Sequence, residues 1–332
     1  MPLGGDGSSV DSNARAGKAA RRTPPSSPIV KSSGRMTRSS ASTITDCRNP
    51  ASKELDAGDT LSILRLIHSQ DSLVPTAVQT QIPNIAKAVD AAVHSVRRGG
   101  RIFYVGAGTS GRLGALDAAE CPPTFGVSPE TVQAVIAGGP RALLQAVESA
   151  EDDRELGRRD LAARKIGPRD IVIGLTASGR TPYTVGALAY ARSRRAATVA
   201  VTSNPGSPIT RFARITIAPA TGPEVLAGST RMKAALAQKM ILHMISTAVM
   251  ARLGHVYKNY MVGVRPTNRK LVKRAVNILV ELTGADAKAA SRALREAGNE
   301  VKTAFVMLRR GLSRTAAENL LRRAGENLRA IE

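Results

Sequence analysis

Two short apolar segments, each running directly into a turn rich in glycine and hydroxyl residues, constrain the fold of this chain most strongly. The first segment, 101–105, is followed by 106–111 (GAGTSG), and the second, 170–175, is followed by 176–182 (TASGRTP). A helical pattern follows each turn, so each unit predicts a buried strand, a tight turn and a helix. Because strands that alternate with helices form parallel sheets covered on both faces, we predict an α/β domain whose ligand lies at the carboxyl ends of the strands.

The rest of the chain continues this alternation and adds helices at both ends. Further strands are predicted at 131–136, 197–201 and 214–217, and further helices from Thr60, from Pro75 toward Val96, after 136 around Leu143, Leu144 and Val147, and over 229–253. The helix after the first turn is expected to end at Pro122 and Pro123, since proline interrupts a helix. The helix over 229–253 is apolar on most sides and should be buried.

After 265–268 the pattern predicts a small helical appendage. One long helix leads to three short ones at roughly 285–297, 300–310 and 315–329, with Gly298 and Gly311 between them. Thr315 and Glu318 have the spacing of a capping box for the last helix.

Residues 1–46 have a composition unlike the rest of the chain. They are rich in Ser, Gly, Pro, Arg and Lys and contain few large apolar side chains, so they cannot offset the entropy of becoming ordered. We predict a disordered basic arm. A solvated segment without a function of its own is favoured over a segment that tethers nucleic acid, and Met36 is an alternative translation start.

Charge and composition restrict the function without naming it. The formal net charge is +22, which attracts nucleic acid, anionic membranes or phosphorylated ligands. Only 3% of residues are aromatic and none is Trp, so base-stacking platforms are disfavoured. The sequence has neither a run of 18 apolar residues nor a secretory signal, and its two cysteines agree with a reducing compartment, so a cytoplasmic protein without a membrane partner is expected.

The two turns provide the first candidate site residues. Glycines 106, 108 and 111 have the spacing of a dinucleotide fingerprint, but the second strand ends in IAGG without the acidic residue that holds a ribose. The hydroxyls of Thr109, Ser110, Ser178 and Thr181 instead suit a single phosphate monoester at helix N-termini, with Arg180 as an additional charge. Helix capping alone explains either turn, whereas two such turns in one sheet favour a phosphate site.

Side chains for catalysis are less clearly marked. The four histidines show no zinc-binding spacing, and Cys121, between Glu120 and two prolines, is expected to be a small buried residue. Carboxyl groups remain, at Glu120 and in the run Glu151, Asp152 and Asp153, and two of them could form an acid and base pair if they converge beside a sugar. Spacing alone favours solvated carboxylates at helix ends.

A family resemblance rests on seven segments spread from Arg48 to the C-terminal region. They are 48–56 (RNPASKELD), 105–126 (VGAGTSGRLGALDAAECPPTFG), 148–152 (ESAED), 177–182 (ASGRTP), 203–206 (SNPG), 228–234 (GSTRMKA) and 265–268 (RPTN). Together they resemble the signature of the N-acetylmuramic acid 6-phosphate etherases. The resemblance covers the chain from about Arg48 to its end and excludes the basic arm.

The resemblance implies a fold, an assembly and a reaction. The implied fold is a sugar-isomerase (SIS) domain, a three-layer α/β sandwich around a parallel sheet, at 47–270, with a C-terminal helical module at 271–332 that resembles ubiquitin-associated domains. The implied enzyme is a homodimer with active sites near the subunit interface. It is a carbon–oxygen lyase that uses water to cleave the lactyl ether of N-acetylmuramic acid 6-phosphate in cell-wall sugar recycling, without cofactor or metal.

Roles for individual residues follow from the same resemblance. By similarity Glu120 protonates the leaving lactate and later activates water, and Glu151 is the second catalytic carboxyl, acting at C2 of the sugar. Thr109, Ser110, Ser178 and Thr181 would bind the phosphate, and the sugar and lactyl pocket would be lined by Asn204, Ser229, Arg231 and Lys233.

Some positions depart from the family pattern, and other functions remain to be weighed. The departures are Ala119, Ser149, Ala235, Leu236, Lys258 and Gly263, and none of them removes a catalytic carboxyl. The main alternative is a non-catalytic sugar-phosphate-binding regulator of the glucokinase-regulatory-protein type, which shares the phosphate-binding layout. A sugar-phosphate isomerase and nonspecific nucleic-acid binding are less favoured, and the presence of both Glu120 and Glu151 favours an enzyme.

Overall fold

A five-stranded parallel sheet forms the centre of the protein. The structure is a computed structural model, and it describes residues 43–266 and 268–331. The strands are β1 (Ile102–Gly106), β2 (Val132–Ile136), β3 (Ile171–Leu175), β4 (Ala197–Val201) and β5 (Ile215–Ile217), in the order β2-β1-β3-β4-β5. Every neighbouring pair is parallel, which confirms the predicted α/β sheet.

The strand order places the topological switch point of the sheet between β1 and β3. The chain leaves β1 to form β2 on one side, then returns to form β3 on the other side of β1. Connections from these two strands therefore diverge, and ligands of open α/β sheets bind at such a switch point. Both predicted phosphate turns follow these two strands.

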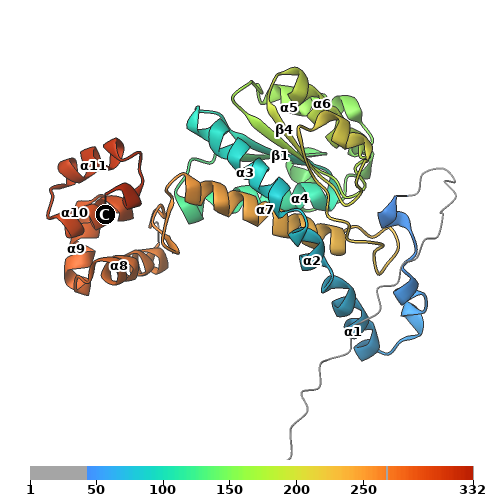
Figure 1. Ribbon diagram of the computed structural model, residues 1–332, viewed down its shortest axis with the longest axis horizontal. Coiled ribbons are helices and arrows are strands. Elements are labelled where there is room, and N and C mark those ends of the chain that lie inside the picture. Colours follow the sequence, from blue (N-terminus) through green and yellow to red (C-terminus); the bar gives the residue numbers. More distant parts are fainter. Residues whose placement is uncertain (1–42, 267, 332) are drawn as a thin grey trace, which may run out of the picture. The chain divides into compact units, whose positions relative to one another are not determined.

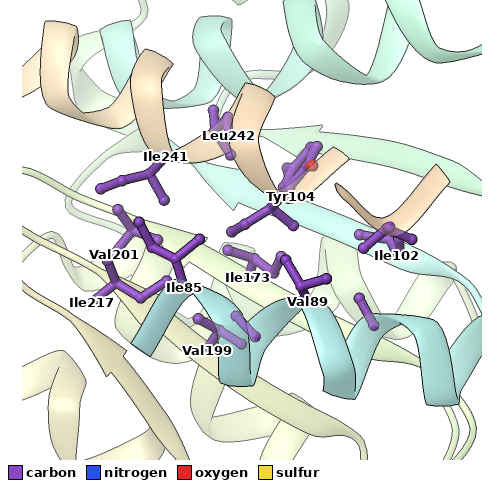
Figure 2. Close-up of a cluster of buried hydrophobic side chains, with 14 of the residues drawn as sticks. Ile85, Val89, Ile102, Tyr104, Ile173, Val199, Val201, Ile217, Ile241 and Leu242 are labelled. Atoms are coloured by element: carbon purple, nitrogen blue, oxygen red, sulfur yellow. The ribbon is translucent and has the colours of Figure 1, made fainter. Parts of the chain in front are cut away.

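Helices cover both faces of the sheet because successive strand residues point to opposite sides. One face buries Ile102 and Tyr104 against α2 (Val74–Gln79), α3 (Ile82–Arg97), α4 (Gly108–Phe125) and α7 (Lys233–Arg252). Figure 2 shows this cluster, with Ile85 and Val89 of α3 and Ile241 and Leu242 of α7 around the strands. The other face buries Phe103 and Val105 against α5 (Arg154–Ala163) and α6 (Pro182–Ser193) (Figure 1).

Two predicted helix boundaries at prolines are wrong. The helix expected from Pro75 to Val96 is divided into α2 and α3, with Pro83 in the first turn of α3, where a missing N–H group costs nothing. Helix α4 continues through Pro122 and Pro123 and ends at Phe125, and the N–H of the following Gly126 donates to the Pro122 carbonyl over 2.9 Å.

Three other local expectations also need correction. The segment around Leu143 and Val147 forms 3₁₀ turns at Gly139–Leu143 and Glu148–Ala150 instead of an α-helix. Helix α7 begins at Lys233, because the side chain of Glu224 accepts hydrogen bonds from the N–H groups that open it. Ser313, and not Thr315, caps the last helix.

The described chain begins inside the predicted arm. Thr43 and Thr45 are buried, and a 3₁₀ turn spans Ile44–Asp46. The prediction for 1–42 lies outside the described residues. Two further 3₁₀ turns, Pro50–Ser52 and Leu55–Ala57, lead to α1 (Thr60–Asp71), which has no buried residue.

The C-terminal region is helical, as expected. It consists of α8 (Arg269–Thr283), α9 (Ala287–Glu296), α10 (Val301–Arg310), α11 (Arg314–Arg323) and a 3₁₀ turn at Leu328–Ala330 (Figure 1). Its hydrophobic cluster includes Tyr257, Val262 and Val264, which belong to or follow an antiparallel hairpin of β6 (Val256–Tyr257) and β7 (Tyr260–Met261) that was not anticipated. Lys258 adopts a φ of 54° in this hairpin, in the left-handed region that favours glycine.

Helix α7 is the one helix among the described residues that is long and apolar enough to cross a membrane. However, 56% of its apolar window is buried inside the protein. Its side chains belong to the cluster beneath the sheet, which explains the apolar composition by packing.

Candidate active site

The first turn leads from β1 into the N-terminal end of α4. Gly108 has a φ of 52° and opens the helix, and a Cβ atom on Gly111 would lie 2.7 Å from the Gly106 carbonyl oxygen. Glycine is therefore required for the helix to start so close to the strand. Thr109 and Ser110 lie half-buried in the first turn of α4, where N–H groups without partners in the helix favour anions.

The second turn follows β3 and is closed by its own hydroxyl groups. Thr176 Oγ1 accepts from the Gly179 N–H at 3.2 Å and lies 2.9 Å from Thr181 Oγ1. Ser178 Oγ accepts from the Arg180 N–H at 3.2 Å and is half-buried. Gly179 has a φ of 71°, and a Cβ there would lie 1.9 Å from the hydroxyl oxygen of Ser207.

Glu151 lies between the two turns. Thr181 Oγ1 donates to Glu151 Oε1 at 3.0 Å, which ties the carboxylate to the second turn. Glu151 Oε2 lies 3.9 Å from the position that a Cβ on Gly108 would occupy, which places it beside the first turn. The Tyr183 N–H at the start of α6 donates to the Glu151 carbonyl over 3.0 Å and fixes the backbone.

Glu120 lies elsewhere on the same chain. It is exposed, in the C-terminal half of α4, twelve residues after Gly108. A rise of about 1.5 Å per residue separates the two positions by roughly 18 Å along the helix axis. One chain alone therefore does not bring Glu120 and Glu151 to neighbouring carbon atoms of a sugar.

Asn204 is part of the frame of the second turn. Its Nδ2 donates to the Ala177 carbonyl at 2.8 Å, and its Oδ1 accepts from the Ile44 N–H at 2.7 Å. The buried amide thus fastens the segment at Thr43 to the turn that carries Ser178. Because these hydrogen bonds engage both the Nδ2 and the Oδ1 of the amide, Asn204 is better suited to hold the second turn in place than to bind a sugar.

The remaining predicted pocket residues precede or begin α7. Ser229 is half-buried and Arg231 is exposed, both in the loop before the helix. Lys233 is only 1% exposed, and its Nζ donates to Gln70 Oε1 at 3.2 Å. Burial lowers the pKa of Lys233, while the neighbouring carboxylate of Glu224 opposes that shift.

Glu224 and Gln70 are buried or partly buried polar residues that sequence reasoning missed. The Glu224 carboxylate accepts from the N–H groups of Lys233 and Ala234, both at 2.9 Å, and burial raises its pKa against these hydrogen bonds. Gln70 also accepts from Asn49 at 2.7 Å. Neither residue belongs to a recognisable catalytic spacing, and only the fold brings them to Lys233.

Cys121 does not act as a nucleophile in this arrangement. It is 1% exposed, and burial raises the pKa of its thiol to about 12. The prediction of a small buried residue is confirmed. The described part of the chain contains no group of three His, Cys, Asp or Glu side chains arranged to hold a metal ion.

Known proteins match nearly all of the chain outside the basic arm. It is 52% identical over 287 residues to the N-acetylmuramic acid 6-phosphate etherases of Yersinia pestis (strain Pestoides F) and Yersinia pseudotuberculosis (serotype O:1b, strain IP 31758), which covers 86% of this chain and 97% of each relative. The family model of the glucokinase regulatory protein N-terminal SIS domain matches residues 84–192, and that of the SIS domain matches 149–248. A solved structure, a putative phosphosugar isomerase from Bacteroides fragilis, has a TM-score of 0.46 and 17% identity over 58% of this chain and 91% of that one.

Proposed function

This chain belongs to the family of N-acetylmuramic acid 6-phosphate etherases, and we propose that Glu120 and Glu151 are the carboxyl groups with which it catalyses that reaction. The enzyme is a carbon–oxygen lyase of amino-sugar recycling. It cleaves the D-lactyl ether at C3 of N-acetylmuramic acid 6-phosphate with water and releases N-acetylglucosamine 6-phosphate and D-lactate.

The chemistry proceeds by elimination and addition. Opening of the pyranose ring exposes an aldehyde at C1, which acidifies the proton on C2. Glu151 removes that proton as a carboxylate, and Glu120 gives a proton to the ether oxygen as lactate leaves C3. Water then adds to C3 of the unsaturated aldehyde, with Glu120 accepting its proton and C2 regaining one. These steps need only two proton carriers and a held phosphate.

The position of Glu151 carries this proposal. It lies against Gly108 and Thr181, between the two turns at the switch point of the sheet. A phosphate held by the hydroxyls of Thr109, Ser110 and Ser178 and by the N–H groups at the start of α4 places the sugar beside this carboxylate. Arg180 supplies additional positive charge near the turn.

Glu120 reaches this site from a second copy of the chain. The helical rise of roughly 18 Å between Gly108 and Glu120 supports a site built from two chains over a site built from one. Exposure of Glu120 on α4 leaves it available to another subunit. The proposed enzyme is therefore a homodimer in which each active site combines Glu151 of one protomer with Glu120 of its partner.

The lactyl carboxylate is assigned to the cations before and at the start of α7. Arg231 is exposed in the loop, and Lys233 lies behind Gln70 of α1. Helix α1 has no buried residue, so little packing opposes a displacement that uncovers Lys233. Ser229 lies in the same loop and would bind the sugar, whereas Asn204 holds the second turn.

The remaining assignments concern organisation and location. We assign 47–270 to the SIS domain, preceded by the basic arm, and 271–332 to a helical module similar to ubiquitin-associated domains, which serves packing or dimerisation. We also propose that the enzyme is cytoplasmic. It is expected to act without cofactor or metal and to bind neither membrane nor specific nucleic acid.

Release of D-lactate tests the function. Purified protein with N-acetylmuramic acid 6-phosphate and a lactate dehydrogenase assay should produce lactate in stoichiometric amounts with N-acetylglucosamine 6-phosphate. Chelator should leave the rate unchanged. Binding of the sugar phosphate without release of lactate would instead identify a non-catalytic regulator. The match of residues 84–192 to the glucokinase regulatory protein domain is the observation that supports this alternative.

A further inference from the structure

A line of hydroxyl groups links the second turn to Glu151. The Gly179 N–H donates to Thr176 Oγ1 at 3.2 Å, Thr176 Oγ1 lies 2.9 Å from Thr181 Oγ1, and Thr181 Oγ1 lies 3.0 Å from Glu151 Oε1. Thr176 is 2% exposed and Thr181 is 8% exposed. These hydrogen bonds are therefore largely shielded from bulk water. In such an interior a hydrogen bond to a charged group is stronger than it is in water.

Counting protons fixes the direction of every bond in this line. An ionised carboxylate accepts hydrogen bonds and donates none. The single hydroxyl proton of Thr181 therefore points to Glu151, so Thr181 Oγ1 must accept from Thr176. The proton of Thr176 is used in that bond, and its oxygen accepts from Gly179.

A bound phosphate adds a second acceptor for these hydroxyl protons, because a phosphate oxygen, like a carboxylate oxygen, accepts hydrogen bonds and does not donate them. Thr181 belongs to the turn that is expected to hold the phosphate, yet its one proton is already given to Glu151. The phosphate and Glu151 compete for the same proton. When Thr181 donates to the phosphate, Glu151 Oε1 loses the hydrogen bond that holds it.

We propose that Thr181, held by Thr176, is a positioning residue that couples phosphate binding to the availability of Glu151. The inference rests on the proposed function, in which Glu151 removes the proton from C2. In the free enzyme Thr181 holds Glu151 Oε1. A phosphate in the turn takes over the Thr181 proton, and Oε1 is released to the sugar. A sugar without phosphate leaves Glu151 held and reacts slowly even when bound.

The experiment supplies the phosphate and the sugar separately. Lactate release is measured from N-acetylmuramic acid 6-phosphate, and from N-acetylmuramic acid with and without inorganic phosphate. In the wild type, inorganic phosphate should raise turnover of the unphosphorylated sugar by about tenfold or more. The reason is that phosphate bound separately in the turn takes the Thr181 proton and so releases Glu151 to act as the base.

Variants of Thr181 distinguish the proposed coupling between phosphate binding and Glu151 from a purely structural role of this residue. Thr181→Ser keeps the hydroxyl and should keep the enhancement by phosphate. Thr181→Val should lose it, and its turnover of unphosphorylated sugar without phosphate should rise above that of the wild type, because Glu151 is never held. A purely structural role would lower both rates. Thr176→Val should reduce the enhancement, and Thr176→Ser should restore it.

Thr184→Val is the matched control. Thr184 is fully buried in α6, one turn beyond Thr181, and its hydroxyl has no hydrogen-bond partner among the described residues. This variant should behave as the wild type in all three reactions. Calorimetric titration with inorganic phosphate shows that each variant still fills the turn.

Two results would overturn the coupling. One is equal enhancement by phosphate in the wild type and in Thr181→Val. The other is no enhancement in a wild type that turns over the phosphorylated sugar. Absence of lactate release from N-acetylmuramic acid 6-phosphate itself would reject the proposed function, and the coupling with it.

Discussion

The two ends of helix α4 differ in what fills the space around them. At the N-terminal end, Thr109 and Ser110 are half-buried, and the Glu151 carboxylate lies beside Gly108. At the C-terminal end, a Cβ on Gly126 would lie 1.8 Å from the carbonyl oxygen of Gly263. The first end presents polar groups to a ligand, whereas the second is packed against the protein itself.

This difference teaches why proximity in sequence is a poor guide to the site. Glu120 follows the first turn closely in the chain, yet it lies toward the packed end of α4 and faces solvent. Glu151 comes much later and lies at the turn. A helix carries its residues away from its start, so under the proposed function the two carboxyl groups would meet at one substrate through a second subunit.

The largest expected effect tests that division between subunits. Glu120→Gln and Glu151→Gln should each lower lactate release on the order of 10³-fold, since each removes one acid or base. Mixing the two inactive variants with subunit exchange should restore about a quarter of wild-type activity, because half of the dimers then contain one intact site out of two.

The mixing experiment has a sharp contrary result. If both carboxyl groups act within one chain, no mixed dimer contains an intact site and the mixture stays inactive. Glu130→Gln, an exposed glutamate in the loop after α4, is a control that should retain full activity alone and in mixtures.

The next effect concerns stability at the packed end of α4. Gly126→Ala should lower the free energy of unfolding by more than about 2 kcal/mol, since the residue has a φ of 68° and its new methyl group meets the Gly263 carbonyl. Urea unfolding followed by circular dichroism measures the loss.

Gly139→Ala is the matched comparison. Gly139 has a φ of 66° but no atom within 4 Å of the added Cβ. It should cost only about 1 kcal/mol, from the backbone conformation alone. Equal losses in the two variants would show that close packing at Gly126 adds nothing.

A smaller effect is expected at the polar end. Ser110→Ala should weaken binding of N-acetylglucosamine 6-phosphate about tenfold, through loss of one hydrogen bond to a charged group. Affinity for unphosphorylated N-acetylglucosamine and the free energy of unfolding should not change. Calorimetric titration measures both affinities, and Ser193→Ala at the exposed end of α6 is the control. Parallel losses for both sugars would remove Ser110 from the phosphate site.

The smallest effect is a pH dependence at the packed end. His255 Nδ1 donates to the Phe125 carbonyl at 2.8 Å, and burial, with the nearby Lys302 charge, lowers the pKa of His255 from 6.5. Below pH 6.5 the unfolded chain therefore binds more protons than the folded one, so stability contributed by neutral His255 is lost as pH falls from 6.5 toward the lowered folded value.

His255→Asn keeps a donor for Phe125 and has no titrating ring. When the pH falls from 7.5 to 5.5, the free energy of unfolding of the wild type should decrease more than that of the variant. The expected difference between the two decreases is at most about 1 kcal/mol, measured by urea unfolding. The same pH dependence in both proteins would assign the loss to other groups.

Much of the fold follows from local patterns in the sequence. Strands β1 and β3 were predicted because each is a short apolar run that ends at a glycine-containing turn, and alternation with helices predicted their parallel pairing. The exceptions are also local. Pro122 and Pro123 predict a helix end, but α4 continues to Phe125 and is capped by the Gly126 N–H.

The site was predictable in residue types and unpredictable in contacts. Ser110 and Ser178 are marked by their place after strands, whereas Thr176 was visible only as one more hydroxyl in a turn. Its hydrogen bond with Thr181 lies within the turn, but the bond of Thr181 with Glu151 joins segments 30 residues apart in the chain. Glu224 and Lys233 meet for the same reason, because a loop returns to the start of α7.

The amino-acid sequence by itself determined the sheet, its two turns and the family, because apolar periodicity, glycine positions and long motifs are local properties of the chain. Only the tertiary structure decided that Glu151 lies at the turns, that Asn204 and Thr181 already have hydrogen-bond partners, and that Glu120 is exposed on α4. Those outcomes depend on which side chains are brought within about 3 Å of each other, and hydrogen bonds form only at such distances.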